Sequence, residues 1–64
     1  MTEFVLVYYA FGGEDREYFY SAREALDRSV EVHNDGYSVV KVMDQEGAMV
    51  YDEQDLTEYY LLVA

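Results

Sequence analysis

Apolar and polar residues alternate along this chain in short runs, and the first run, residues 3–11, is apolar on both of its alternating faces. β-branched and aromatic residues dominate it, which favours a strand. Apolar side chains on both faces are typical of a strand in the middle of a sheet. One face carries Phe4, Leu6, Tyr8 and Ala10, and the other carries Val5, Val7, Tyr9 and Phe11.

Turn-forming residues divide the other strand-like runs into two predicted hairpins. Gly12 and Gly13 tolerate positive φ, so we expect residues 16–20 to return beside the first strand. The second hairpin is predicted from a strand over 37–43, a turn over 44–47 that ends in Gly47, and a strand over 48–51.

Between the hairpins the sequence predicts an amphipathic helix. Ser21 and Glu24 form an S-x-x-E capping box, in which each side chain satisfies a free backbone amide of the first turn. The helix is expected to run to about Asn34 and to end at Gly36, which suits a left-handed cap. With about 100° per residue, the predicted inward side consists of Ala22, Ala25, Leu26, Ser29, Val30 and His33.

The last segment permits two structures. Asp52 can cap a helix with Asp55 three residues later, and the apolar positions that follow have helical spacing. Residues 59–63 are also rich in strand formers, so a fifth strand is the alternative. The helical pattern rests on Leu56, Tyr59, Tyr60 and Val63.

The expected order of elements is therefore β-β-α-β-β-α, in one small acidic α+β domain over residues 1–64. Strands joined by tight turns favour a four-stranded antiparallel sheet with two helices on one face. The opposite face would then expose apolar side chains of the first strand. Such a patch is typical of an interaction surface, and a homodimer through this uncovered sheet face is one expected use.

Charge separates this chain from most small domains. Its 64 residues include 14 carboxylates and 4 basic side chains, for a formal charge of -10. A hydrophobic fraction of 52% with 8 tyrosines is too high for a disordered acidic tail, so we expect a folded globule. An acidic surface repels anionic lipids and nucleic-acid phosphates. We therefore expect that the protein binds neither membranes nor nucleic acid directly.

The sequence offers little for catalysis, and we expect no enzyme, cofactor or dedicated metal site. His33 is the only histidine, and Ser29 one turn before it has no accompanying oxyanion loop. Acid pairs such as Glu14 and Asp15 do not match a calcium-binding loop, and there is no cysteine. The start of the chain carries an acidic residue and a short apolar run, so we expect a cytoplasmic protein without a leader.

The acidic side chains suggest a basic protein as the partner. On the predicted helix, Glu24, Asp27 and Glu31 form a stripe with charges about 4.5 and 6 Å apart along the axis, similar to phosphate spacing. A folded body with such charges can occupy the basic groove of a nucleic-acid-binding protein. The predicted contact residues are Glu24, Asp27, Glu31, Asp44, Glu46, Asp52, Glu53, Tyr9, Tyr18 and Tyr20.

In size and charge, though not in any motif, the chain resembles small phage-encoded inhibitors of host defence, including anti-CRISPR and DNA-mimic proteins. The resemblance implies a non-catalytic inhibitor or decoy, and it transfers no site residues. Two alternatives stay open. One is a small assembly module whose acidity serves solubility, and the other is adaptation to high salt, suggested by a single lysine, Lys41.

Overall fold

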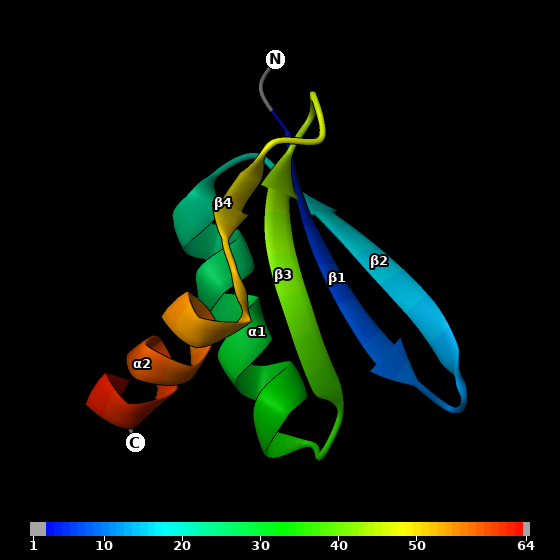
Figure 1. Cartoon of the computed structure of the whole chain (residues 1–64), viewed down its shortest axis with the longest axis vertical. Helices are drawn as coiled ribbons and strands as arrows, with labels where there is room; N and C mark the ends of the chain where they lie inside the picture. Colours follow the sequence, from blue (N-terminus) through cyan, green and yellow to red (C-terminus); the bar gives the residue numbers. More distant parts are fainter. Residues whose placement is uncertain (1–2, 64) are drawn as a thin grey trace.

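A four-stranded antiparallel sheet with two helices on one of its faces makes up the protein (Figure 1). The computed structural model describes residues 3–63. Its radius of gyration is 10.8 Å, close to the value of about 11 Å expected for a packed chain of this length. The elements are β1 (Phe4–Ala10), β2 (Gly13–Phe19), α1 (Ala22–Asn34), β3 (Ser38–Asp44), β4 (Met49–Tyr51) and α2 (Glu53–Val63).

The predicted order β-β-α-β-β-α and the α+β class are confirmed. The strand order in the sheet is β2-β1-β3-β4, so the first apolar run is an inner strand as its two apolar faces indicate. Leu6 and Tyr8 of β1 and Val42 of β3 face the helices and form the core with them. The helices contribute Ala25, Leu26, Val32, Leu56 and Tyr60.

The first hairpin turns one residue earlier than expected. Ala10 pairs with Gly13, and the two residues between them, Phe11 and Gly12, have φ of 54° and 80°. This is the φ pattern of a type I′ turn, whose twist matches that of the strands. The prediction of positive φ at Gly13 was therefore wrong, and Phe11 belongs to the turn rather than to the strand.

Phe11 holds an unfavourable backbone conformation in this turn. A left-handed conformation costs a non-glycine residue about 1–2 kcal/mol. Phe11 is also 94% exposed, so little burial offsets this cost. Its ring approaches Tyr37 edge to face, with ring centroids 5.6 Å apart.

Phe11→Asn is expected to raise the free energy of unfolding by about 0.5–1 kcal/mol, because asparagine tolerates a left-handed conformation better and Asn-Gly is a preferred type I′ pair. Urea denaturation followed by circular dichroism measures the change. A loss of stability instead would mean that the contact with Tyr37 outweighs the backbone strain.

The Ser21 half of the predicted capping box and the predicted Gly36 cap are both present on α1, whereas the Glu24 side chain accepts no hydrogen bond within residues 3–63. The Ser21 Oγ accepts from the Glu24 amide at 3.1 Å. At the other end Gly36 has φ of 93°, and the Tyr37 amide donates to the Val32 carbonyl at 3.2 Å, as in a Schellman cap.

The predicted inward side of α1 was wrong at two positions. Val32 is buried against the sheet, whereas His33 is exposed. The helix packs against the sheet with Ala25, Leu26, Ser29 and Val32 inward, so its contact stripe is rotated from the predicted one.

The C-terminal segment is a helix, which rules out the alternative fifth strand. The Asp52 Oδ1 accepts from the Asp55 amide at 2.8 Å, and the Asp55 carboxylate accepts from the Asp52 amide at 3.2 Å. This reciprocal cap fixes the start of α2 before the strand-forming residues are reached. Leu56 and Tyr60 are buried as the pattern predicts, but Val63 is half exposed.

The face of the sheet away from the helices, here called the uncovered face, is less apolar than expected. Val7 lies on it yet is only 1% exposed, because its cross-strand neighbours are Arg16 and Lys41. The alkyl stems of such long side chains can cover apolar surface while their charges stay in water. Tyr9 and Tyr18 remain well exposed there.

Candidate functional site

Three of the four basic side chains form ion pairs within the described residues, and two of these, Arg23 and Arg28, lie on α1. Arg23 pairs with Asp27 at 3.2 Å, and Arg28 pairs with Glu31 at 3.0 Å. Of the predicted acidic stripe, therefore, only Glu24 makes no ion pair within residues 3–63. The stripe offers a cationic partner less free negative charge than its sequence indicates.

Glu17 on β2 connects the edge of the sheet to α1. It accepts hydrogen bonds from the Tyr8 hydroxyl at 2.6 Å and from Arg28 Nε and Nη2 at 3.0 and 3.2 Å. The hydrogen bonds from Arg28 lower the pKa of Glu17 against the opposing effect of burial, and the bond to Glu17 raises the pKa of Tyr8. Sequence reasoning did not find this group, because β2 and α1 carry no local signal of which side chains will meet.

The free negative charge is concentrated after Lys41, in residues 42–63, here called the acidic segment. It contains six carboxylates and no lysine or arginine. The carboxylates are Asp44, Glu46, Asp52, Glu53, Asp55 and Glu58.

Half of the acidic segment's carboxylates also hold its backbone in place. The Asp44 Oδ1 accepts from the amides of Glu46 and Ala48, both at 2.9 Å, and closes the turn between β3 and β4. Asp52 and Asp55 cap α2 as described above. The side chains of Glu46, Glu53 and Glu58 make no hydrogen bond or ion pair to any part of residues 3–63 and remain available to a partner.

The tyrosines predicted to contact a partner lie apart from the acidic segment. Tyr9, Tyr18 and Tyr20 are each at least half exposed. Tyr18 lies on β2 and Tyr20 follows it, at the edge of the sheet opposite β4. The ten predicted contact residues thus form three separate groups, on α1, around β4 and α2, and around β1 and β2.

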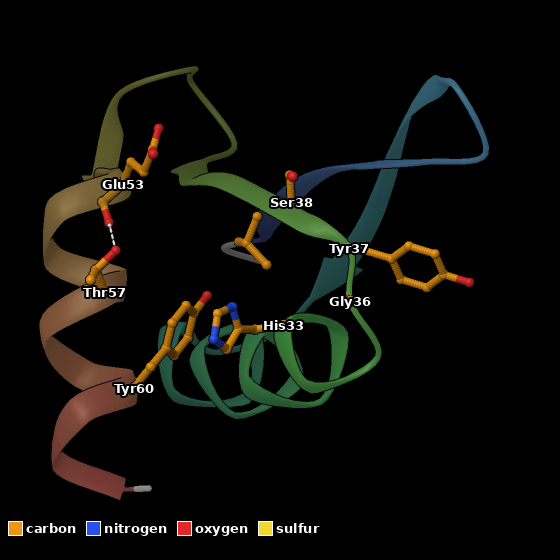
Figure 2. A pocket seen from close by; sticks show the side chains of 8 residues that line it. His33, Gly36, Tyr37, Ser38, Glu53, Thr57 and Tyr60 are labelled. Atoms are coloured by element: carbon orange, nitrogen blue, oxygen red, sulfur yellow. Dashed lines mark hydrogen bonds between the residues drawn. The ribbon is translucent and has the colours of Figure 1, made fainter.

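A groove lies where α2 faces the end of α1 and the start of β3 (Figure 2). Its volume is about 360 Å³. The rings of His33 and Tyr60 stack on each other with centroids 4.4 Å apart and planes 17° apart. The lining consists of His33, Gly36, Tyr37, Ser38, Val39, Glu53, Thr57 and Tyr60.

The hydroxyl of Tyr60 is buried at this groove and has no hydrogen-bond partner within residues 3–63. Burial raises the pKa of Tyr60. The neighbouring Ser29 hydroxyl opposes the shift, but the two groups do not have hydrogen-bond geometry, and Ser29 donates to the Leu26 carbonyl at 2.5 Å. A buried hydroxyl without a partner costs about 1–3 kcal/mol.

Sequence reasoning missed the groove because it joins residues of α1, β3 and α2. The sequence places His33 on the predicted inward side of the first helix, one turn after Ser29, and Tyr60 in the helical pattern of the last segment. In the structure Ser29 is buried and its hydroxyl is hydrogen-bonded to its own helix. The His33 ring instead lies on Tyr60, so Ser29 and His33 have different partners. No sequence spacing indicates that residues 27 positions apart will stack.

Two further findings concern metal binding and membrane crossing. Within residues 3–63, no three histidine, aspartate or glutamate side chains gather closely enough to hold a metal ion. Neither of the two helices described has the length and hydropathy needed to cross a bilayer.

No protein-family model, curated protein or solved structure matches this chain.

Proposed function

We propose that this chain is a non-catalytic binding protein that occupies a basic, nucleic-acid-binding surface of a partner protein. The observation that supports this best is the acidic segment, in which six carboxylates occur with no basic residue on a folded hairpin and helix. Charge of one sign raises the rate at which an oppositely charged surface is met and disfavours other partners.

The distribution of ion pairs changes which residues should contact the partner. On α1, Asp27 and Glu31 already have arginine partners. Around β4 and α2, Glu46, Glu53 and Glu58 have none within the described residues. We therefore expect the acidic segment to make the main contact, with Glu24 and the rest of the α1 stripe contributing less.

The test is capture of partner proteins by the immobilised protein from a nuclease-treated lysate, at about 50 mM and 500 mM salt. Glu46→Gln, Glu53→Gln and Glu58→Gln together should weaken capture at least about fivefold at low salt, since each lost contact to a cationic surface is worth a few tenths to 1 kcal/mol. The captured proteins should bind DNA or RNA, and added nucleic acid should release them.

A second triple variant controls for total charge. Glu3→Gln, Asp15→Asn and Asp35→Asn remove the same three charges from exposed positions outside the acidic segment. This variant should retain capture within about threefold. Equal losses in both variants, or binding that neither salt nor nucleic acid affects, would contradict the proposal.

The assembly module remains the second candidate, because Tyr9 and Tyr18 are exposed together on the uncovered face and Met49 of β4 is exposed as well. Such side chains are common at protein interfaces. Sedimentation over a wide concentration range discriminates the two. A dimer that forms without any basic protein would favour assembly, and a monomer at all concentrations would exclude the homodimer.

A further inference from the structure

We propose that the groove between α2 and the start of β3 binds the guanidinium group of an arginine side chain presented by the basic partner. The inference rests on the function proposed above and names the chemistry that one part of the acidic segment recognises.

The polar groups of the groove are suited to a ligand that only donates hydrogen bonds. The Thr57 hydroxyl gives its proton to the Glu53 carbonyl at 2.9 Å, which leaves its lone pairs for a ligand. The Glu53 carboxylate can only accept. No lysine or arginine lines the groove, so an anionic ligand would find no counter-charge. A guanidinium group has five N–H donors and no acceptor.

The buried Tyr60 hydroxyl is a second and independent sign of a ligand. The residue is 9% exposed, and its oxygen has no partner within residues 3–63. Figure 2 shows this hydroxyl pointing past the edge of the His33 ring toward the interior of the groove. Its lone pairs can accept a hydrogen bond from an N–H group of a ligand.

The aromatic stack favours arginine over lysine. A guanidinium group is planar, more weakly hydrated than an ammonium group, and stacks on aromatic faces. His33 is an exposed ring that already stacks on Tyr60. The volume of about 360 Å³ is near the lower end of ordinary ligand pockets, about 300–1,000 Å³, and fits one long side chain better than a folded segment.

The experiment titrates the ¹⁵N-labelled protein with Nα-acetyl-arginine amide and follows backbone amide shifts. Saturable shifts should cluster at His33, Gly36–Val39, Thr57 and Tyr60. The citrulline analogue has the same shape without the charge and should cause no saturable shift. The lysine analogue should bind about threefold more weakly.

Three variants locate the contact. Glu53→Gln should weaken arginine binding about fivefold, which is the effect of losing a partly exposed ion pair. Glu46→Gln removes the same charge from the turn outside the groove and should change binding less than twofold. Tyr60→Phe removes only the hydroxyl and should weaken binding about threefold.

Shifts spread over all acidic residues, equal effects of the two glutamate variants, citrulline binding as well as arginine, or lysine binding more tightly would each overturn this inference. Those results leave the proposed function standing if the triple variant of the acidic segment still loses partner capture. If capture instead survives in that variant, the proposed function fails whatever the arginine titration shows.

Discussion

Replacing Leu56 with alanine is expected to lower the free energy of unfolding by about 2–5 kcal/mol and to release α2 from the sheet. Leu56 is 1% exposed and lies in the core cluster with Leu6 and Val42. A domain below about 70 residues seldom has more than about 3–5 kcal/mol of stability from one core. The variant should therefore be largely unfolded at 25 °C.

The same helix provides the matched control for this change. Leu62 is 83% exposed, so Leu62→Ala deletes the same atoms without opening a cavity. It should alter stability by no more than about 0.5 kcal/mol. Urea denaturation measured by far-UV circular dichroism compares the two variants. Similar losses for both would show that α2 is not anchored through Leu56.

The second large effect is expected from Glu17→Ala, which should cost about 2–3 kcal/mol. The change removes the acceptor of the Tyr8 hydroxyl and of two Arg28 donors, and a hydrogen bond to a charged group is worth about 1.5–3 kcal/mol. Because Glu17 is partly exposed, the losses do not add in full. Glu46→Ala is the control, since it removes one charge from an exposed turn.

The pH dependence of stability follows from the same group. Arg28 lowers the pKa of Glu17, so the native state holds this proton less tightly than the unfolded chain. The stabilisation is present above the ordinary value of 4.5 and is lost as the pH falls through the lower native value. For Tyr8 the pKa is raised, so its contribution is present below 10.0 and is lost as the pH rises through the higher native value.

Glu17→Gln separates titration from packing. Glutamine keeps the size of the side chain and an acceptor oxygen but cannot be protonated in this range. Its stability between pH 5 and 3 should therefore fall less than that of the unchanged protein, as measured by urea midpoints at each pH. An unchanged acid dependence would show that other carboxylates cause the loss.

Local patterns were sufficient for the elements and the class of fold. Four of these patterns act through neighbours a few residues away, and all appear in the structure. They are the Ser21 cap, the Asp52 cap, the left-handed Gly36 and the two apolar faces of β1. The wrong predictions arose where the same local pattern permitted two conformations. Phe11 takes a turn position that was expected for Gly13, since Ala10 pairs with Gly13 and the two turn residues are Phe11 and Gly12.

The third strand shows why periodicity alone failed to place every side chain. A bulge beside Val7 and Tyr8 of β1 leaves Val40 as an extra residue, so Val39 and Val42 both oppose helix-facing residues. Strict alternation would have placed them on opposite faces. β3 lies between β1 and β4 in the sheet and packs against both helices, and no neighbouring residue in the sequence specifies that arrangement.

The sequence by itself determined the two hairpins, the two helices and the excess of carboxylates, because these depend on residue type and on spacing within a few positions. The tertiary structure decided which carboxylates are free. Arginines of α1 neutralise Asp27, Glu31 and Glu17, while Glu46, Glu53 and Glu58 have no cation within the described residues. It also brought His33 against Tyr60, since such pairs form only when distant segments pack and the packing is chosen by the whole core.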